Sequence, residues 1–246
     1  MSVEALAALV RAHQPCVVLT GAGISTESGI PDFRSPTGIW ARYDPMEYAT
    51  IDAFVADPAK VWDFYGKRLA ALGEAEPNEG HHALAQLEAR GWIDAVITQN
   101  VDGLHVRAGS TNVIEVHGSI RTATCTVCGR TIPAREALAT LPVPACPDCG
   151  HVLKPDVVLF GELLPAAAID RAARLAYEAR LLLVVGSSLE VHPVAGLPLE
   201  TLAAGGKVAI VNRGETPLDG EATVRIDAGA GETLSALARL LADRLE

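Results

Sequence analysis

Residues 17–34 read Val-Val-Leu-Thr-Gly-Ala-Gly-Ile-Ser-Thr-Glu-Ser-Gly-Ile-Pro-Asp-Phe-Arg, and this stretch decides the fold. The β-branched and aliphatic run at 16–19 predicts a buried strand. Gly21 and Gly23 follow at once, and we expect a helix to begin after them. In α/β proteins a strand, a Gly-x-Gly turn and a helix start bring backbone N–H groups close to a pyrophosphate, because glycine permits the sharp turn and the close approach. The stretch therefore predicts an α/β fold with a phosphate-binding turn.

The glycine pair alone does not identify a nucleotide site. The third glycine of a Gly-x-Gly-x-x-Gly pattern falls at Thr26, the next glycine is Gly29, and many strand–helix turns carry such a pair without a nucleotide. Asp32, Phe33 and Arg34 follow with an acid, an aromatic ring and a guanidinium. Two interpretations stay open at this point. One is an irregular loop with a local Asp–Arg pair, which these residues in isolation favour, and the other is a lid that closes over a bound cofactor.

Composition and charge narrow the class of protein. The chain has 246 residues, of which 49% are hydrophobic, enough for a sizeable core. The net charge of −10 argues against tight binding to nucleic acid. No apolar run approaches the roughly 18–20 residues of a membrane span, and the N-terminal stretch reads as an amphipathic helix without a leader. The five cysteines do not form a disulfide framework, and Cys16 reads as a small buried hydrophobe. We expect a soluble protein of a reducing cytoplasm.

Strands and helices alternate along the chain. Residues 181–185 are wholly apolar, as expected of a strand at the centre of a parallel sheet. The predicted strands are 16–19, 94–98, 112–116, 155–160, 181–185, 207–211 and 222–226. The predicted helices are 3–13, 58–72, 77–90 with Asn78 as N-cap, 166–180, 194–204 and 233–244, and 35–48 is expected to be a loop.

Polar residues follow several of these strands. Ligands of open α/β sheets bind at the carboxyl ends of the strands. Residues 99–105 read Gln-Asn-Val-Asp-Gly-Leu-His after one strand, and His117 comes directly after the next. An unperturbed histidine titrates near about pH 6.5, so His117 suits a general base, although a lone histidine is more often structural. Small polar loops at 186–188 and 212–214 follow two later strands.

Four cysteines have the spacing of a zinc site. They form Cys-x2-Cys-x17-Cys-x2-Cys, and each pair is followed by glycine, which suits a tight knuckle. Four thiolates close the coordination shell, so the zinc is expected to be structural; His151 is a rival ligand that the site does not need. The predicted ligands are Cys125, Cys128, Cys146 and Cys149.

These elements predict a doubly wound, Rossmann-like parallel sheet. We expect residues 1–34, 90–119 and 155–246 to form this Rossmann-like domain, whose NAD-binding role is implied only by the resemblance described next. A helical insertion at 35–89 and a zinc-binding insertion at 120–154 interrupt it and are expected to form a smaller domain.

The motifs, taken together and in this order, resemble one family. They are residues 21–34, Thr-Gln-Asn-Val-Asp-Gly-Leu-His at 98–105, His-Gly at 117–118, the paired Cys-x-x-Cys units, Phe-Gly-Glu at 160–162 and Gly-Ser-Ser at 186–188. They look like those of the sirtuins, NAD-dependent protein lysine deacylases, across nearly the whole chain. The resemblance favours the lid interpretation of residues 32–34. It implies NAD as co-substrate, one structural zinc ion per chain and acylated lysine in peptides or proteins as substrate.

The resemblance also implies residue roles. His117 is the expected general base, with Asn100 beside it in the catalytic set, and the acyl group passes to ADP-ribose as nicotinamide leaves. The residues expected to bind NAD are Gly21, Ala22, Gly23, Asp32, Phe33, Arg34, Gln99, Asn100, Val101, Asp102, Gly186, Ser187, Ser188, Asn212, Arg213, Gly214 and Ala230. The residues expected to flank the substrate peptide are Phe160, Gly161, Glu162 and Val191.

Tyr65 and Arg68 refine the expected substrate. They lie three apart on one face of the predicted helix 58–72, where the ordinary interpretations are a core aromatic and a surface ion pair. The pattern Tyr-x-x-Arg resembles that of the class III sirtuins, of the desuccinylase and demalonylase type. An Arg fork binds a carboxylate with two hydrogen bonds, and a phenol supplies a third donor. We therefore expect preference for succinyl- or malonyl-lysine, with acetyl-lysine also accepted.

Three other functions remain as alternatives. Mono-ADP-ribosyl transfer is the nearest, and a hydride-transferring NAD enzyme is more distant. The third is a zinc-ribbon interaction or nucleic-acid module without turnover. Against it stand the acidic net charge, the few basic residues and the lack of any aromatic residue between 120 and 154.

Overall fold

The computed structural model describes residues 1–242 and contains a six-stranded parallel sheet. The strand order is β3-β2-β1-β7-β8-β9, so β1–β3 form one half and β7–β9 the other, and the halves meet where β1 lies beside β7. The strands are β1 (Cys16–Thr20), β2 (Ala95–Thr98), β3 (Val113–Glu115), β7 (Leu181–Val185), β8 (Lys207–Val211) and β9 (Val224–Ile226). This is the doubly wound sheet that the sequence predicts, with the wholly apolar strand 181–185 near its centre.

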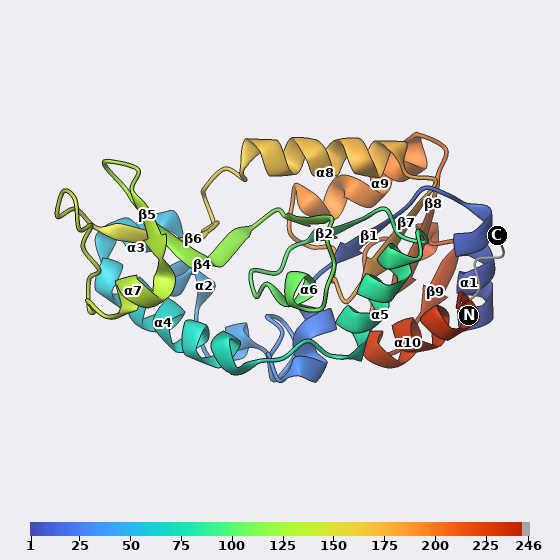
Figure 1. The fold of residues 1–246 in the computed structure, drawn as a ribbon, viewed down its shortest axis with the longest axis horizontal. Coiled ribbons are helices and arrows are strands. Elements are labelled where there is room, and N and C mark those ends of the chain that lie inside the picture. The colour runs from blue at the N-terminus through green and yellow to red at the C-terminus, as the bar shows by residue number, and fades with distance from the viewer. Residues whose placement is uncertain (243–246) are drawn as a thin grey trace.

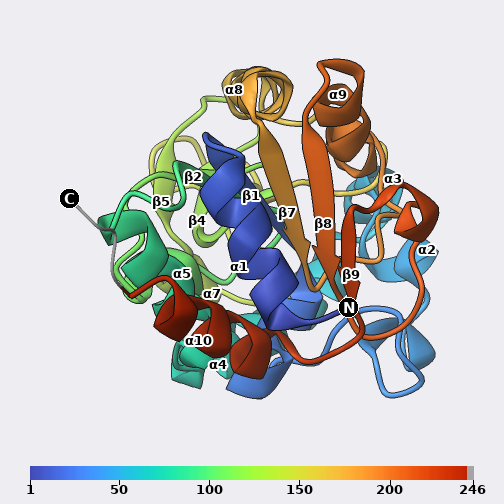
Figure 2. The same ribbon diagram turned by 90° about the vertical axis from the view of Figure 1, so that its right-hand side faces the viewer.

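Helices cover both faces of this sheet, and the strands alternate between two cores. On β7, Leu181, Leu183 and Val185 face the helices α1 (Val3–Ala12), α5 (Glu79–Ala89) and α10 (Ala230–Leu240). Leu182 and Val184 face α8 (Ala166–Glu178) and α9 (Leu197–Ala203), on the opposite side (Figure 2). Fully burying such a side chain contributes about 1.5–3 kcal/mol, so burial on both faces accounts for the continuous apolar run.

Segments of both expected insertions pack together as a second lobe (Figure 1), whereas α5, within the expected helical insertion 35–89, packs on the core of the larger sheet. The zinc insertion forms the antiparallel sheet β5-β4-β6, with β4 (Gly118–Cys125), β5 (Thr131–Pro133), β6 (Leu153–Val157) and the helix α7 (Ala134–Leu138). The helical insertion contributes α2 (Pro45–Tyr48), α3 (Ile51–Ala56) and α4 (Pro58–Glu74). Trp62 of α4 is fully buried, and its indole N–H donates to the Leu153 carbonyl across 2.7 Å. One apolar core therefore joins segments that lie far apart in the sequence.

One predicted strand belongs to a different sheet from the one expected. The strand expected at 155–160 in the parallel sheet is β6, which pairs antiparallel with β4 in the smaller lobe. Its residues alternate between buried and half-buried positions, which suits a strand with one exposed face and not the interior of a parallel sheet. The return from the zinc insertion to the larger sheet therefore comes after residue 157.

Local caps explain the other differences from the predicted elements. The expected loop 35–48 contains a 3₁₀ turn, η2 (Ile39–Ala41), and α2, and the unpredicted α3 follows them. The Asp44 and Thr50 side chains accept hydrogen bonds from the first turns of α2 and α3, as N-caps do. The helix expected after Gly23 is a 3₁₀ helix, η1 (Ala22–Ser28). Asn78 caps α5 as predicted, although that helix begins at Glu79.

The closing helix was expected at 233–244 and is α10, which begins earlier, at Ala230, and ends at Leu240. Residues 243 and 244 lie outside the part of the chain that the structure describes.

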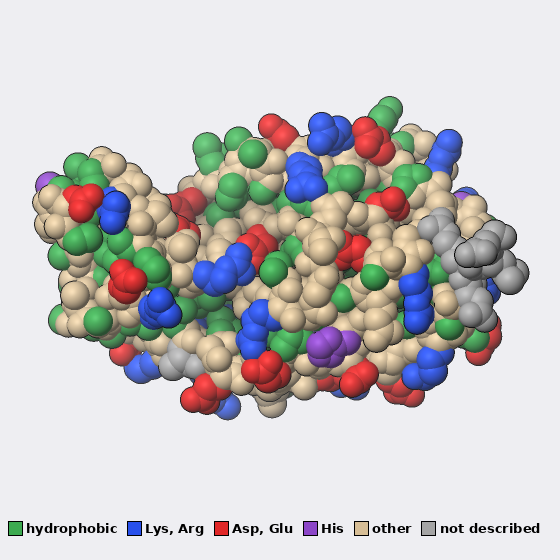
Figure 3. All heavy atoms as spheres, viewed as in Figure 1, with side chains coloured by type: hydrophobic (Ala, Val, Ile, Leu, Met, Phe, Trp, Pro, Cys, Tyr) green, Lys and Arg blue, Asp and Glu red, His purple; other side chains and the backbone are tan. Residues whose placement is uncertain are grey.

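The surface shows no continuous basic area on the face drawn in Figure 3. Lys and Arg side chains are interspersed there with Asp and Glu. That nucleic acid is an unlikely partner stays a prediction from the net charge of −10. Among residues 1–242, no helix has the length and apolar character needed to cross a membrane.

Candidate active site

A cavity of about 770 Å³ lies where the carboxyl ends of β1, β2, β7 and β8 meet the smaller lobe. It brings together nearly all the residues that the sequence predicts for NAD and substrate. They are Gly21, Ala22, Gly23, Asp32, Phe33, Arg34, Tyr65, Arg68, Gln99, Asn100, Val101, Asp102, His117, Phe160, Gly161, Glu162, Gly186, Ser187, Ser188, Val191, Asn212, Arg213 and Ala230. Gly214 is the exception: it lies in the next turn at φ +81°, and its carbonyl accepts from the Asn212 and Arg225 side chains.

The glycine turn packs directly on the end of β7. The Gly21 N–H donates to the Val185 carbonyl across 3.1 Å, and the Gly23 N–H donates to the Gly186 carbonyl across 2.8 Å. A Cβ on Gly23 would lie 2.7 Å from Gly186 Cα, closer than side chains tolerate. Glycine is therefore required here by contact between two backbones, which form one wall of the cavity.

His117 presents one ring nitrogen to the cavity. Its Nδ1 lies 3.1 Å from the Gln99 carbonyl. A carbonyl only accepts, so Nδ1 carries the proton and Nε2 keeps its lone pair. Burial lowers the pKa of His117 from its ordinary value, and the Gln99 bond opposes this shift in part. The ring is therefore neutral at neutral pH and suited to accept a proton.

A buried polar network holds the polar residues that follow β2. Asn100 Nδ2 donates to Ser25 Oγ across 3.0 Å and to the Gly21 carbonyl across 3.2 Å. Ser25 Oγ donates to the Asp102 carboxylate across 2.8 Å, and His81 Nε2 lies 3.4 Å from the same hydroxyl. Burial raises the pKa of Asp102, although bonds from the Leu104 N–H and Ser25 offset this in part.

Sequence reasoning did not single out Ser25 or His81. Both are buried polar residues, which are normally satisfied by specific partners. Ser25 lies inside the glycine-turn motif, and His81 is the third residue after the predicted N-cap Asn78. That spacing is the available signal for His81, because the ring accepts from the Asn78 N–H in a capping box.

The segment after the glycine turn folds back on itself. Asp32 Oδ1 accepts from the Arg34 and Ser35 N–H groups at 3.0 and 2.8 Å. The Arg34 side chain pairs with Glu190, at 2.8 Å, on the loop after β7. The local Asp–Arg ion pair of the loop interpretation is therefore wrong. The Asp32 carboxylate accepts from backbone N–H groups, and the Arg34 side chain pairs with Glu190 on another loop that lines the cavity. The lid interpretation stays a proposal.

Tyr65 and Arg68 both face the cavity. Tyr65 is buried, and burial raises its pKa to about 12, so the phenol keeps its proton and can donate. Arg68 is half-buried and, within residues 1–242, lies within 4.0 Å of no carboxylate oxygen. The ordinary interpretation of Arg68 as half of a surface ion pair is therefore wrong.

The loop after β6 forms the wall opposite the parallel sheet. The Phe160 N–H donates to the Ala49 carbonyl at 2.8 Å, and the Phe160 carbonyl accepts from Ile51 at 3.0 Å. The Glu162 carboxylate accepts from Lys154 Nζ at 3.0 Å and from the Leu159 N–H at 2.8 Å. Glu162 thus lines the cavity, but its carboxylate is already hydrogen-bonded within the loop and stabilises the conformation of that loop.

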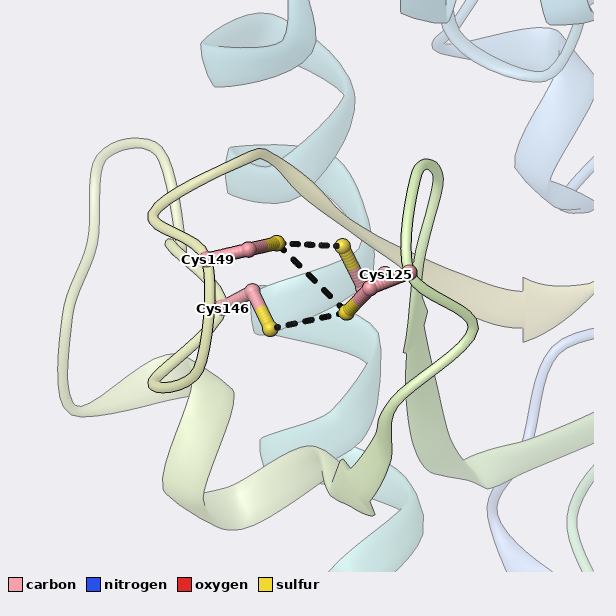
Figure 4. A group of neighbouring side chains, drawn as sticks. Cys125, Cys146 and Cys149 are labelled. Atoms are coloured by element: carbon pink, nitrogen blue, oxygen red, sulfur yellow. Dashed lines mark hydrogen bonds between the residues drawn. The ribbon is translucent and has the colours of Figure 1, made fainter.

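Four cysteine sulfurs gather at the tip of the smaller lobe (Figure 4). All four lie within 4.8 Å of one another, and three Sγ–Sγ distances are 3.4, 3.6 and 3.4 Å. Tetrahedral zinc with bonds of about 2.3 Å places its sulfurs about 3.8 Å apart, so the arrangement fits one zinc ion. His151 Nδ1 bonds to the Cys149 carbonyl at 3.1 Å and is not part of the cluster.

Comparisons with known proteins find a matching family and several similar chains. The sequence model of the Sir2 family matches residues 21–193. An NAD-dependent protein deacylase of Thermus thermophilus is 48% identical over 89% of this chain and 87% of its own length. An NAD-dependent protein deacetylase of Sulfolobus acidocaldarius is 50% identical over 87% of this chain and 85% of its own.

Two solved structures are also similar to this chain in fold and sequence. A mutant Sir2 homologue in complex with ADP-ribose superposes with a TM-score of 0.95, at 43% identity and over 99% of both chains. A Sir2 protein bound to a propionylated peptide has a TM-score of 0.89, at 40% identity, over 97% of this chain and 98% of that one.

Proposed function

The chain belongs to the Sir2 family and is an NAD-dependent protein deacylase, and from that premise we propose that it prefers lysines carrying succinyl or malonyl groups. Acetyl-lysine is a weaker substrate in this proposal. The observation that carries it is the Arg68 guanidinium, which faces the cavity without a carboxylate partner among the residues described.

A half-buried guanidinium is costly unless something compensates its charge. Arginine stays protonated in proteins, although burial lowers the pKa of Arg68 somewhat. A terminal carboxylate on the acyl group would supply the missing anion, in a bidentate pair. A plain acetyl group would leave the fork unpaired, which favours the acidic substrate.

Tyr65 supplies a second donor near the same place. Its pKa of about 12 keeps the phenol protonated at any pH where the enzyme works. Because Tyr65 and Arg68 lie three residues apart on α4, they are neighbours on one helix face. Together they form the proposed recognition site for the acyl carboxylate.

The residues at the strand ends hold and activate the reacting groups in this proposal. When bound, NAD would supply the ribose carbon at which the acyl oxygen displaces nicotinamide, and the acyl group would pass from the lysine to ADP-ribose. Asn100 and Asp102 bind the ribose and carboxamide and are held in place by Ser25. His117 accepts a ribose hydroxyl proton at Nε2, because Gln99 fixes the proton at Nδ1. Exclusion of bulk water from the cavity when its ligands are bound would protect NAD from hydrolysis.

In this proposal the four-cysteine cluster binds a zinc ion that stabilises the fold and takes no part in the chemistry. Zinc held by four thiolates has no open position for a substrate. The ligands Cys125, Cys128, Cys146 and Cys149 close the zinc insertion, on which β4 and β6 depend. The cytoplasmic location stays a prediction from composition.

The test compares matched succinyl-lysine and acetyl-lysine peptides by kcat/KM. We expect Arg68→Met to lower succinyl activity roughly 10- to 100-fold, since a charge-assisted hydrogen bond contributes about 1.5–3 kcal/mol. Acetyl activity should change little. Arg68→Lys is the matched control, because it keeps the charge but loses the planar fork of donors. Its succinyl activity should lie between that of the wild type and that of Arg68→Met. Equal losses on both peptides would refute the role of Arg68.

The same reactions separate the alternative functions. Mass spectrometry of the peptide product reveals loss of the acyl group or addition of ADP-ribose. Free nicotinamide is expected, whereas NADH would indicate hydride transfer.

A further inference from the structure

Among residues 1–242, two aromatic rings lie against the Arg68 guanidinium and no carboxylate oxygen lies within 4.0 Å of it, although the more distant Asp102 carboxylate favours its charged form. The Arg68 Cζ lies 5.0 Å from the centre of the Phe33 ring and 5.8 Å from the centre of the Phe64 ring. Phe64 precedes Arg68 by one turn of α4, whereas Phe33 comes from the segment after the glycine turn. The guanidinium is thus supported by two segments that are separate in the sequence and pack on the same apolar core.

An aromatic ring contacts the face of a guanidinium, whereas a carboxylate bonds to the N–H groups at its edge. A ring attracts the cation over its face, within about 6 Å of its centre. The N–H donors point outward in the plane of the guanidinium, so face contact leaves them available. Aromatic support therefore stabilises the charge of Arg68 without using the donors that an incoming carboxylate needs.

Phe33 lies in a short segment with several contacts of its own. Its carbonyl accepts from the Trp40 N–H at 3.0 Å, and the Asp32 carbonyl accepts from Ile39 at 2.9 Å. The Trp40 and Phe33 rings lie 5.2 Å apart. A Cβ on Gly38 would lie 2.8 Å from the Phe33 carbonyl carbon, so this segment is packed closely against itself.

The same short segment lines the cofactor side of the cavity. Asp32 and Arg34 flank Phe33 in the sequence and face the same cavity. The position of Phe33 against Arg68 is therefore tied to the position of the backbone beside the expected NAD site.

We propose that Phe33 is a specificity-determining positioning residue that holds Arg68 for an acidic acyl group and links acyl recognition to NAD binding. This rests on the proposed acyl preference. A carboxylate that fixes Arg68 also favours the Phe33 contact, and with it the position of residues 32–34 that lines the NAD site. Because such coupling is reciprocal, NAD binds more tightly beside a succinyl peptide than beside an acetyl peptide.

The experiment uses the full chain with NAD and matched peptides. In the wild type, we expect KM for NAD to be lower with the succinyl peptide than with the acetyl peptide, by roughly two- to thirtyfold, the range of a cation–π contact. In Phe33→Leu this difference disappears, and the succinyl-to-acetyl ratio of kcat/KM falls by a similar factor. Phe33→Tyr keeps the ring face and should keep both effects.

Phe64→Leu is the matched control. It removes the other ring from Arg68 and reaches Phe33 only through the Trp40 ring, which lies 6.2 Å from Phe64 and 5.2 Å from Phe33. The succinyl-to-acetyl ratio should therefore fall while KM for NAD keeps most of its dependence on the acyl group. Calorimetry of the succinyl peptide without NAD gives a readout apart from turnover: both leucine variants should weaken binding, whereas acetyl peptide binding should hold. Thermal melting confirms that each variant is folded.

The outcomes separate this inference from the acyl preference. If the wild type prefers succinyl through Arg68, and Phe33→Leu lowers both peptides by one factor with the ratio intact, Phe33 only excludes water and the inference fails. If the wild type shows no succinyl preference and Arg68→Met changes nothing, the proposed acyl preference fails, and this inference falls with it.

Discussion

His117 donates its Nδ1 proton to the Gln99 carbonyl across 3.1 Å, which leaves Nε2 as the free base. The two residues lie at the ends of neighbouring strands, β3 and β2, so the sheet itself sets this contact. The backbone therefore fixes the tautomer of His117, without a carboxylate that would raise its pKa strongly.

The first prediction concerns the pH dependence of deacylation. Because burial lowers the pKa of His117, the ring stays neutral to lower pH than an ordinary histidine, whose pKa is about 6.5. We expect kcat/KM to be constant at neutral pH and to fall only on acidification below that value. His117→Ala should lose roughly 10²- to 10⁴-fold. An acid limb above about pH 6.5 in the wild type would contradict the assigned environment of the ring.

The second prediction concerns acid stability, because two histidines are buried as neutral rings. Burial lowers the pKa of His81 to about 4 and that of His105 to about 3. The unfolded chain binds these protons near about pH 6.5, whereas the folded chain does not. The stability of the neutral rings is therefore present above that pH and is lost as the pH falls toward 4, by up to about 1.4 kcal/mol per pH unit for each ring.

Denaturant unfolding at several pH values from 7 to 4 measures this loss. His81→Asn should flatten the dependence, since asparagine does not titrate. His82→Asn is the matched control, because His82 is exposed on the same helix and should leave the slope nearly unchanged. A wild-type stability that does not decline between pH 6.5 and 4 would contradict the prediction.

The sequence predicts the main sheet well because its signals are local. Strands such as 181–185 are buried on both faces, so a continuous apolar run marks them without tertiary information. The prediction places the strand at 155–160 in the wrong sheet, because the sheet that β6 joins is set by its pairing with β4, about 30 residues earlier in the chain. The missed helix α3 is too short for a periodic pattern to appear.

The candidate site shows the same contrast between local signals, which the sequence reveals, and contacts between distant segments, which it does not. The cavity residues after β1, β2, β7 and β8 follow from strand ends and motif resemblance. The partners are not predictable in this way: Arg34 pairs with Glu190, and Arg68 lies on Phe33. These contacts join residues on separate elements, and only tertiary packing brings them together.

The third prediction concerns removal of zinc. Structural zinc binds small modules with about 10–16 kcal/mol, which is comparable to the stability of a whole domain, about 5–15 kcal/mol. We expect chelation, or Cys146→Ser, to unfold the zinc insertion and abolish activity, since β6, which pairs with β4, and the loop after it carry a wall of the cavity. Metal analysis should give one zinc ion per wild-type chain. His151→Gln should bind the same amount, and loss of zinc in that variant would make His151 a ligand.

The fourth prediction concerns Gly186, at the contact between β7 and the glycine turn. Its φ is +61°, and a Cβ there would lie 2.4 Å from the Ile24 nitrogen and 2.6 Å from the Gly23 carbonyl carbon. Gly186→Ala therefore adds two costs: backbone strain of about 1–2 kcal/mol and a clash with backbone that has no room to move. We expect a large loss of thermal stability and of NAD binding, because the displaced atoms belong to the cavity wall.

Gly205→Ala separates these two costs. Gly205 also has a positive φ, +83°, but a Cβ there would meet nothing within 4 Å, and the residue lies in the exposed turn before β8. It should therefore lose only the strain energy and bind NAD normally, as calorimetry can measure. If the two variants are destabilised equally and both bind NAD, the contact between the glycine turn and β7 does not shape the site, and the glycines are explained by backbone conformation alone.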